Sequence, residues 1–234
     1  MAEGKNRIST GIFGLDEITS GGIPVGNQVL IAGDAGTGKT LLSFEILYRN
    51  AKINIPCTFI TLEERRDSLL ENIKSAFPYF DDMNELLESK LIILEERETI
   101  NAMNSSENWQ VFIASINKTL QSNKSKILVI DSITTLRALA SNDRVFTRSV
   151  DYMIENFRNL GINTIVTLET AWPLGKTTAG LYGTYMFDGI IKMHEVDVSG
   201  SSQYLIKIMK MRQSDHVKAS MPYEITSKGL NVFK

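Results

Sequence analysis

The amino-acid sequence predicts an α/β fold: a doubly wound, mainly parallel twisted sheet with helices on both faces. Antiparallel hairpins are expected in the carboxyl-terminal part of the chain. Short runs rich in Val, Ile and Leu alternate with longer helical stretches, which is typical of parallel sheets. Several of these runs are almost continuously apolar, as strands covered on both faces must be. After residue 185 only strand-like runs follow.

The predicted strands and helices take turns along the chain. The strand-like runs cover residues 27–33, 56–62, 91–95, 126–131 and 163–168. Helical periodicity falls between them at 39–51, 66–76, 107–121 and 144–160. Gly161 is placed to end the last helix, one face of which is expected to carry Val145, Val150, Ile154, Phe157 and Leu160.

The carboxyl-terminal part of the chain is expected to be antiparallel. Runs 189–197 and 203–211 flank a short Ser- and Gly-rich segment that suits a hairpin loop. A second pair of runs, 221–226 and 229–233, meets at residues 227–229. Because no Pro-rich linker and no internal repeat interrupts the pattern, residues 1–234 are expected to form one domain.

Composition excludes several classes of protein. Hydrophobic residues make up 43% of the chain and charged residues 22%, which suits a soluble globular domain and not a disordered or collagen-like chain. A net charge of −2 supplies no overall positive field for nucleic acid. The single cysteine, Cys57, excludes an internal disulfide framework. With neither a signal-peptide core nor a membrane-length apolar run, we expect a cytoplasmic protein without membrane contact.

A complete phosphate-binding loop lies between the first long strand and the first long helix. The segment follows the pattern G-x-x-x-x-G-K-[ST], and the strand before it and helix after it disfavour an incidental glycine-rich turn. Its glycines allow backbone N–H groups to wrap closely around phosphate oxygens. The lysine would reach the β- and γ-phosphates, and the hydroxyl of Thr40 would hold Mg²⁺. The predicted nucleotide-binding residues are Gly33, Asp34, Ala35, Gly36, Thr37, Gly38, Lys39, Thr40 and Leu41.

Acidic residues stand at the carboxyl ends of other predicted strands. Asp131 ends the run 126–131, where it could join Thr40 in the Mg²⁺ shell; an ordinary strand-end turn is the alternative. Glu63 and Glu64 follow another strand and could accept a proton from an attacking water. Spacing alone favours equally that these two glutamates occupy the first turn of a helix, where its dipole stabilises them. Asp34 and Glu169 are lesser acidic candidates.

Five segments, in order, resemble KaiC-type ATPases of the RecA superfamily. The resemblance covers about residues 7–233, nearly the whole chain. Its segments are the entry 9–26, the strand ending in Glu63-Glu64, the Asp131-Ser132 segment with Thr135-Leu136, Lys210-x-Arg212-x-x-x-His216, and the closing hairpin 222–233.

The resemblance implies a RecA-like core that binds ATP and Mg²⁺ between subunits of a ring, usually a hexamer. It favours a catalytic role for Glu63 and Glu64 over the structural alternative. It also implies that Lys210, Arg212 and His216 reach the nucleotide of the neighbouring subunit, where a cation neutralises charge developing on the γ-phosphate. A basic, solvent-facing strand edge is the alternative for these residues.

The function expected from this resemblance is slow ATP hydrolysis that serves signalling or the regulation of a protein partner. A RadA-paralogue role in DNA repair is the main alternative, with single-stranded DNA at Arg137, Arg144, Arg148, Trp172, Lys176, Tyr182 and Tyr185. The sparse basic charge of residues 171–185 disfavours it. An ATP-assembled scaffold with negligible turnover is a third possibility, which the intact glutamate pair disfavours, and a small-molecule kinase ranks lower.

Autophosphorylation is a separate question that the resemblance raises. The clock protein of this family carries two such domains in tandem and modifies a Ser/Thr pair before its hairpin. The matching segment here keeps Thr184 but has Tyr185 in place of the second hydroxyl residue, so modification of Thr184 is a low-ranking hypothesis.

Overall fold

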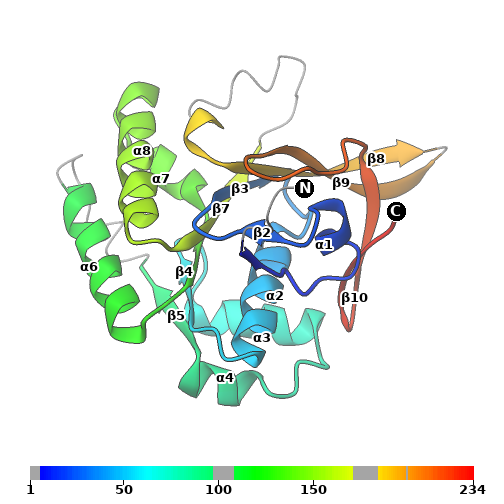
Figure 1. The fold of residues 1–234 in the computed structure, drawn as a ribbon, viewed down its shortest axis with the longest axis horizontal. Coiled ribbons are helices and arrows are strands. Elements are labelled where there is room, and N and C mark those ends of the chain that lie inside the picture. Colours follow the sequence, from blue (N-terminus) through cyan, green and yellow to red (C-terminus); the bar gives the residue numbers. More distant parts are fainter. Residues whose placement is uncertain (1–5, 97–107, 171–183, 199) are drawn as a thin grey trace.

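The computed structural model describes residues 6–96, 108–170, 184–198 and 200–234, and it has the expected α/β architecture (Figure 1). A nine-stranded sheet forms its centre. From one edge to the other, the strands are β11 (Gly229–Val232), β10 (Met221–Thr226), β9 (Ser201–Met211), β8 (Gly189–Val198), β3 (Gln28–Gly33), β7 (Asn163–Glu169), β6 (Ile127–Asp131), β4 (Cys57–Thr61) and β5 (Leu91–Glu95).

The sheet is parallel from β8 to β5 and antiparallel from β8 to β11. Each of the five strands predicted before residue 170 and each of the four predicted after it is present within two residues of its expected bounds. A separate two-stranded sheet joins β1 (Arg7–Ile8) to β2 (Ile23–Pro24). These two strands were not predicted, because two residues cannot carry a periodic pattern.

Helices cover both faces of the large sheet, as the apolar strands require (Figure 1). Successive residues of β3 show the reason: Val29 and Ile31 join one core cluster, and Leu30 and Ala32 join the other. The first cluster packs under α2 (Lys39–Lys52), α3 (Arg66–Ala76) and α4 (Met83–Ser89), near α1 (Leu15–Ile18). The second packs under α6 (Asn108–Asn123), α7 (Ile133–Leu139) and α8 (Asp143–Asn159).

The buried face of α8 differs in part from the predicted one. Val150, Ile154 and Phe157 are buried as expected, but Phe146 and Met153 complete the face. Leu160 lies beyond the helix and is 40% exposed, and Val145 is half-buried. The side chain of Asn142 caps the helix, and Gly161, with φ of 68°, follows its end as predicted.

A β-bulge interrupts the pairing of β8 with β9. Ile190 pairs with Lys210, but the next residue, Ile191, pairs with Ile208, so Met209 is the extra residue of the bulge. Regular alternation would carry Lys210 to the buried face with Ile208. The bulge instead buries Met211 and leaves Lys210 half-buried, so that its ammonium group reaches polar partners.

None of the helices in the described ranges is both long enough and apolar enough to cross a membrane.

Candidate nucleotide-binding site

The phosphate-binding loop connects the carboxyl end of β3 to the start of α2, as predicted. Its backbone is held from within, because the Thr37 hydroxyl and the Lys39 ammonium group each donate to the carbonyl of Asp34 at 2.8 Å. Gly38 has φ of 82°, and a Cβ there would stand 2.5 Å from Cδ1 of Ile225. A glycine is therefore required where the loop turns into the helix.

Two strands from the carboxyl-terminal part of the chain, β8 and β10, hold this loop in place. At Gly33 a Cβ would lie 2.3 Å from the carbonyl oxygen of Met193 on β8, so the strands approach too closely for any side chain. From β10, the buried hydroxyl of Tyr223 donates to the carbonyl of Thr37 at 2.6 Å. Sequence analysis gave Tyr223 no such role, because nothing in a β-rich run indicates which of its residues meets a distant loop.

The predicted metal pair is in direct contact. The Thr40 hydroxyl donates to Oδ2 of Asp131 at 2.8 Å, and the Thr167 hydroxyl donates to Oδ1. Asp131 is 8% exposed. Burial, and next the negative charges of Glu63 and Glu64, raise the pKa of Asp131, although the two hydroxyl bonds oppose the shift. Thr167 was not predicted; a polar residue inside an apolar strand is the only signal that pointed to it.

This pair suits Mg²⁺ bound together with a nucleotide. The described residues contain no group of three or more acidic, histidine or cysteine side chains that could hold a metal ion by themselves. Mg²⁺ commonly takes only one or two protein oxygens and completes its shell with phosphates and water. Thr40 and Asp131 offer that donor set beside a loop shaped for phosphate.

The two candidate glutamates lie between β4 and α3 and have different partners. Oε1 of Glu63 accepts hydrogen bonds from Ser132 at 2.5 Å and Thr135 at 3.2 Å, both on the segment after Asp131. Oε2 of Glu64 accepts from Nδ2 of Asn72 on α3 at 3.0 Å. The alternative that both occupy the first turn of a helix is wrong, because α3 begins only at Arg66.

Lys39 lies among carboxylates. Burial lowers the pKa of its ammonium group, and the charges of Glu169, Asp131, Asp34 and Glu63 act in the opposite direction. Asp34 is held by the hydroxyl of Thr170 at 2.9 Å, beside the end of β7. The charges of the lesser candidates Asp34 and Glu169 thus act on the lysine together with those of Asp131 and Glu63.

Lys210 and Arg212 lie at the opposite end of β3 from the phosphate-binding loop. Lys210 donates to the carbonyl of Phe187 at 2.6 Å, and Arg212 pairs with Asp188 at 3.3 Å. The backbone N–H of Asp188 donates to the carbonyl of Gln28, the first residue of β3, whereas the loop follows the last residue of β3. At about 3.3 Å per residue, β3 separates these two ends by roughly 15–20 Å.

His216 lies in the connection between β9 and β10. Its ring nitrogen Nδ1 is buried and has no hydrogen-bond partner in the part of the chain that the structure describes. The next residue, Val217, donates its N–H to the carbonyl of Ile18 at 2.9 Å, which ties this connection to α1. Lys210 and Arg212 are thus separated from the phosphate-binding loop of their own chain, and His216 is held beside α1.

The residues considered for DNA do not form one described surface. Arg144 and Arg148 are exposed on α8, and Arg137 pairs with Asp143 at 3.1 Å. Tyr185 is 63% exposed in the short helix η2 (Thr184–Met186). Trp172, Lys176 and Tyr182 lie outside the described residues.

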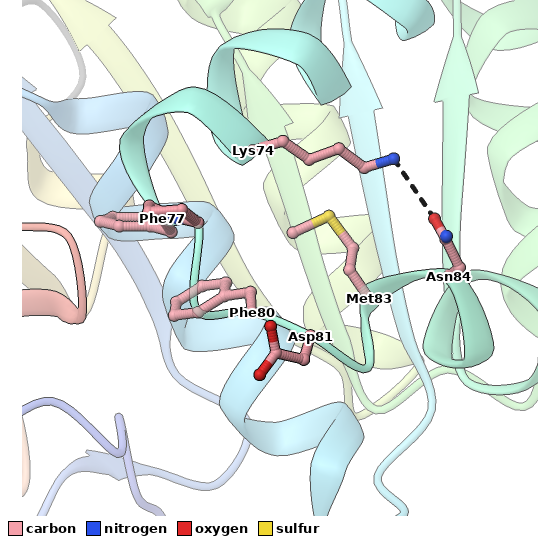
Figure 2. A pocket seen from close by; sticks show the side chains of 7 residues that line it. Lys74, Phe77, Phe80, Asp81, Met83 and Asn84 are labelled. Carbon is pink, nitrogen blue, oxygen red and sulfur yellow. Dashed lines mark hydrogen bonds between the residues drawn. The ribbon is translucent and has the colours of Figure 1, made fainter.

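A separate cavity of about 290 Å³ opens at α3 and α4 (Figure 2). The rings of Phe77 and Phe80 line one side of it, and on the other the Lys74 ammonium group donates to Oδ1 of Asn84 at 3.3 Å. This cavity includes none of the predicted site residues.

Comparison with known proteins shows similarity over nearly the whole chain. The family model described as "ATPase: KaiC" matches residues 8–234. The circadian clock oscillator protein KaiC of Rippkaea orientalis is 29% identical over 99% of this chain, and that of Synechococcus elongatus is 28% identical over 97%. The chain covers only 44% of the length of either relative.

A solved structure extends the likeness to three dimensions. The KaiC-like protein from the hyperthermophilic archaeon Pyrococcus horikoshii OT3 aligns with a TM-score of 0.84 and 27% identity, over 99% of this chain and 100% of its own. Sequence and fold therefore agree over the whole chain, which belongs to the KaiC family of RecA-like ATPases.

Proposed function

We propose that the chain binds Mg-ATP at its phosphate-binding loop and hydrolyses it slowly at the interface between subunits of a ring. The observation that carries this proposal is the separation of the site into two halves. Thr40, Asp131 and Glu63 gather beside the loop, whereas Lys210 and Arg212 lie at the other end of β3, beside its first residue. A head-to-tail ring brings these two surfaces of neighbouring subunits together.

In this proposal the residues 33–41 hold the nucleotide. Backbone N–H groups of the loop and the start of α2 bind the phosphates, and Lys39 exchanges its bond to the Asp34 carbonyl for the β- and γ-phosphates. Thr40 and Asp131 would hold Mg²⁺. When bound, the ion neutralises charge on the phosphate oxygens.

Glu63 is the better placed of the two glutamates to act as the base. Ser132 and Thr135 hold its Oε1 on the Asp131 side, and its charge acts on Lys39. Oε1 is occupied by these two donors, and a carboxylate has a second oxygen that can orient an attacking water and accept its proton. Glu64 is turned toward Asn72 and supports the negative field of the site.

Lys210 and Arg212 would complete the site of the next subunit. Preorganised cations at the γ-phosphate stabilise the charge that develops as the bond to the leaving group breaks. ATP then affects assembly as well as chemistry, because the nucleotide lies between the two surfaces. This coupling would let the nucleotide state of the ring regulate a protein partner in signalling.

The test combines size and activity on the same sample. We expect size-exclusion chromatography with light scattering to show, with Mg-ATP, a ring of six subunits or close to it, and phosphate release to follow that fraction. Lys39→Ala should abolish nucleotide binding, whereas the exposed Lys118→Ala should change neither property. Full activity in a monomer fraction would contradict the intersubunit site.

A further inference from the structure

The turn at residues 185–188, which leads into β8, is held by three cations. Its successive carbonyl oxygens at positions 185, 186 and 187 accept hydrogen bonds from Arg212 at 3.0 Å, Arg158 at 2.8 Å and Lys210 at 2.6 Å. Two of these cations are the residues proposed to act on the neighbouring nucleotide. The third, Arg158, comes from the last turn of α8.

The Asp188 carboxylate lies between Arg158 and the more exposed Arg212 and accepts a hydrogen bond from each. Oδ2 accepts the backbone N–H of Gln28 at 3.1 Å and Nη2 of Arg158 at 3.0 Å, and Oδ1 accepts Nη1 of Arg212 at 3.3 Å. Side-chain exposure rises along this row, from 13% at Asp188 to 31% at Arg158 and 50% at Arg212. One oxygen of Asp188 is therefore anchored by Gln28 and Arg158, and the other is bonded to the exposed guanidinium group of Arg212.

Charge and hydrogen bonding keep this carboxylate ionised. Burial by itself would raise the pKa of Asp188, but the bonds from Gln28 and Arg158 outweigh burial and hold the pKa below its usual value. A negatively charged carboxylate is therefore bonded to Arg212 throughout the neutral pH range. A long, flexible side chain with such a partner loses less conformational freedom when it later meets a phosphate.

We propose that Asp188 is a positioning residue: anchored by Arg158, it orients the guanidinium group of Arg212 for the nucleotide of the neighbouring subunit. This inference rests on the proposed function of Arg212. The guanidinium group has five N–H donors, so its bonds to Asp188 and to the carbonyl of Tyr185 fix its direction and still leave donors for a γ-phosphate. Orientation established before the reaction lowers the barrier of the chemical step.

A purely structural role for Asp188 is the competing explanation, because its backbone also makes hydrogen bonds that hold the turn. The N–H of Asp188 donates to the carbonyl of Gln28, and its carbonyl accepts the N–H of Arg212, both at 2.8 Å. These bonds do not depend on the side chain. Asp188→Asn keeps them, keeps an acceptor for Gln28, and removes the charge that faces Arg212.

The test is a double-mutant cycle on phosphate release, with Asp188→Asn, Arg212→Ala and the double variant assayed as Mg-ATP-loaded rings. We expect Asp188→Asn to lower kcat about ten- to a hundredfold through misplacement of Arg212, with KM for ATP, ring size and Tm close to wild type. In the Arg212→Ala background the same change should lower kcat no further. Asp197→Asn, on the same hairpin, is the matched control.

Each outcome decides a different point. An equal loss of kcat from Asp188→Asn with and without Arg212 would show a structural role and overturn the inference, as would an Asp188→Asn variant with wild-type kcat while Arg212→Ala is impaired. Wild-type kcat in Arg212→Ala would refute the proposed function itself, and the inference with it. If Asp188→Asn does not fold, Arg158→Gln removes the anchor instead, and its loss of kcat must likewise vanish without Arg212.

Discussion

At the scale of one residue, Asp131 carries the buried charge to which the proposed function assigns Mg²⁺ binding. Its carboxylate is almost fully buried and satisfied by two threonine hydroxyls, and no cation side chain is bonded to it within the described residues. Burial raises the pKa of Asp131 because the ionised form loses hydration. The charge therefore costs folding free energy in the nucleotide-free chain, and a bound divalent cation would offset that cost.

Asp131→Asn is accordingly expected to stabilise the nucleotide-free fold. A raised folded-state pKa means that the folded chain binds more protons than the unfolded chain, so the wild type gains stability as the pH falls from neutral through that pKa toward the usual value of 3.8. At neutral pH the variant should unfold at a higher temperature, by about 1 kcal/mol in unfolding free energy, and the difference should shrink on acidification. Thermal unfolding across this pH range measures it.

The same variant should lose the stabilisation that Mg-ATP gives the wild type, because the metal pair is broken. The exposed Asp151→Asn on α8 serves as the control for both measurements. A variant less stable than the wild type at neutral pH, with an undiminished response to Mg-ATP, would contradict this account of Asp131.

At the scale of elements, the carboxyl-terminal hairpin supports the phosphate-binding loop. β10 brings Tyr223 to the carbonyl of Thr37 and Ile225 against Gly38. Its partner β11 supplies the N–H of Leu230 to the buried carboxylate of Glu45 on α2. The loop and the helix after it are therefore held by a hairpin that lies almost 200 residues away in sequence.

Tyr223→Phe tests this support, since it removes one hydroxyl and keeps the ring. Without that donor, the carbonyl of Thr37 loses a hydrogen bond whose typical net contribution is about 0.5–1.5 kcal/mol. If the loop relaxes as a result, the affinity for Mg-ATP should fall roughly two- to tenfold. Titration calorimetry of the variant measures the change. Tyr204→Phe, whose ring lies 5.6 Å from that of Tyr223, is the control, and unchanged affinity in Tyr223→Phe would show that β10 does not shape the loop.

Local sequence predicted most elements, because each central strand is apolar on both faces and each long helix carries its own period. It predicted the phosphate-binding loop for the same reason, since the chemistry of that loop is local. The bulge at Met209 was not predictable, because it depends on how two strands share a register. The α8 face was shifted because Phe146 and Met153, not Val145 and Leu160, meet the sheet.

Side-chain partners across the fold were the part that sequence could not supply. Asp131 accepts hydrogen bonds from the side chains of Thr167 and Thr40, which links β6 to β7 and α2. Only the order of strands in the sheet brings these three residues together. Ser132 and Thr135 reach Glu63 for the same reason. Residue types indicated the chemistry, whereas topology determined which of them meet.

For the whole molecule, opposite ends of the central strands carry complementary halves of one proposed site. The chain spans less than half the length of its curated KaiC relatives, yet it matches the archaeal KaiC-like structure from end to end. A sheet with the two halves at opposite ends of its strands suits a head-to-tail contact, which closes into a ring when the rotation allows. Catalysis would then be a property of neighbouring pairs of subunits.

The most direct test of this central claim is to mix two inactive variants and measure phosphate release. Glu63→Gln keeps Arg212 but lacks the base, and Arg212→Ala keeps the base but lacks the cation. Each alone should form rings with little turnover, and in mixed rings up to about a quarter of the interfaces join an intact loop to an intact arginine. Activity that reappears on mixing is the predicted result; mixed rings that stay as inactive as their parents would contradict an intersubunit site.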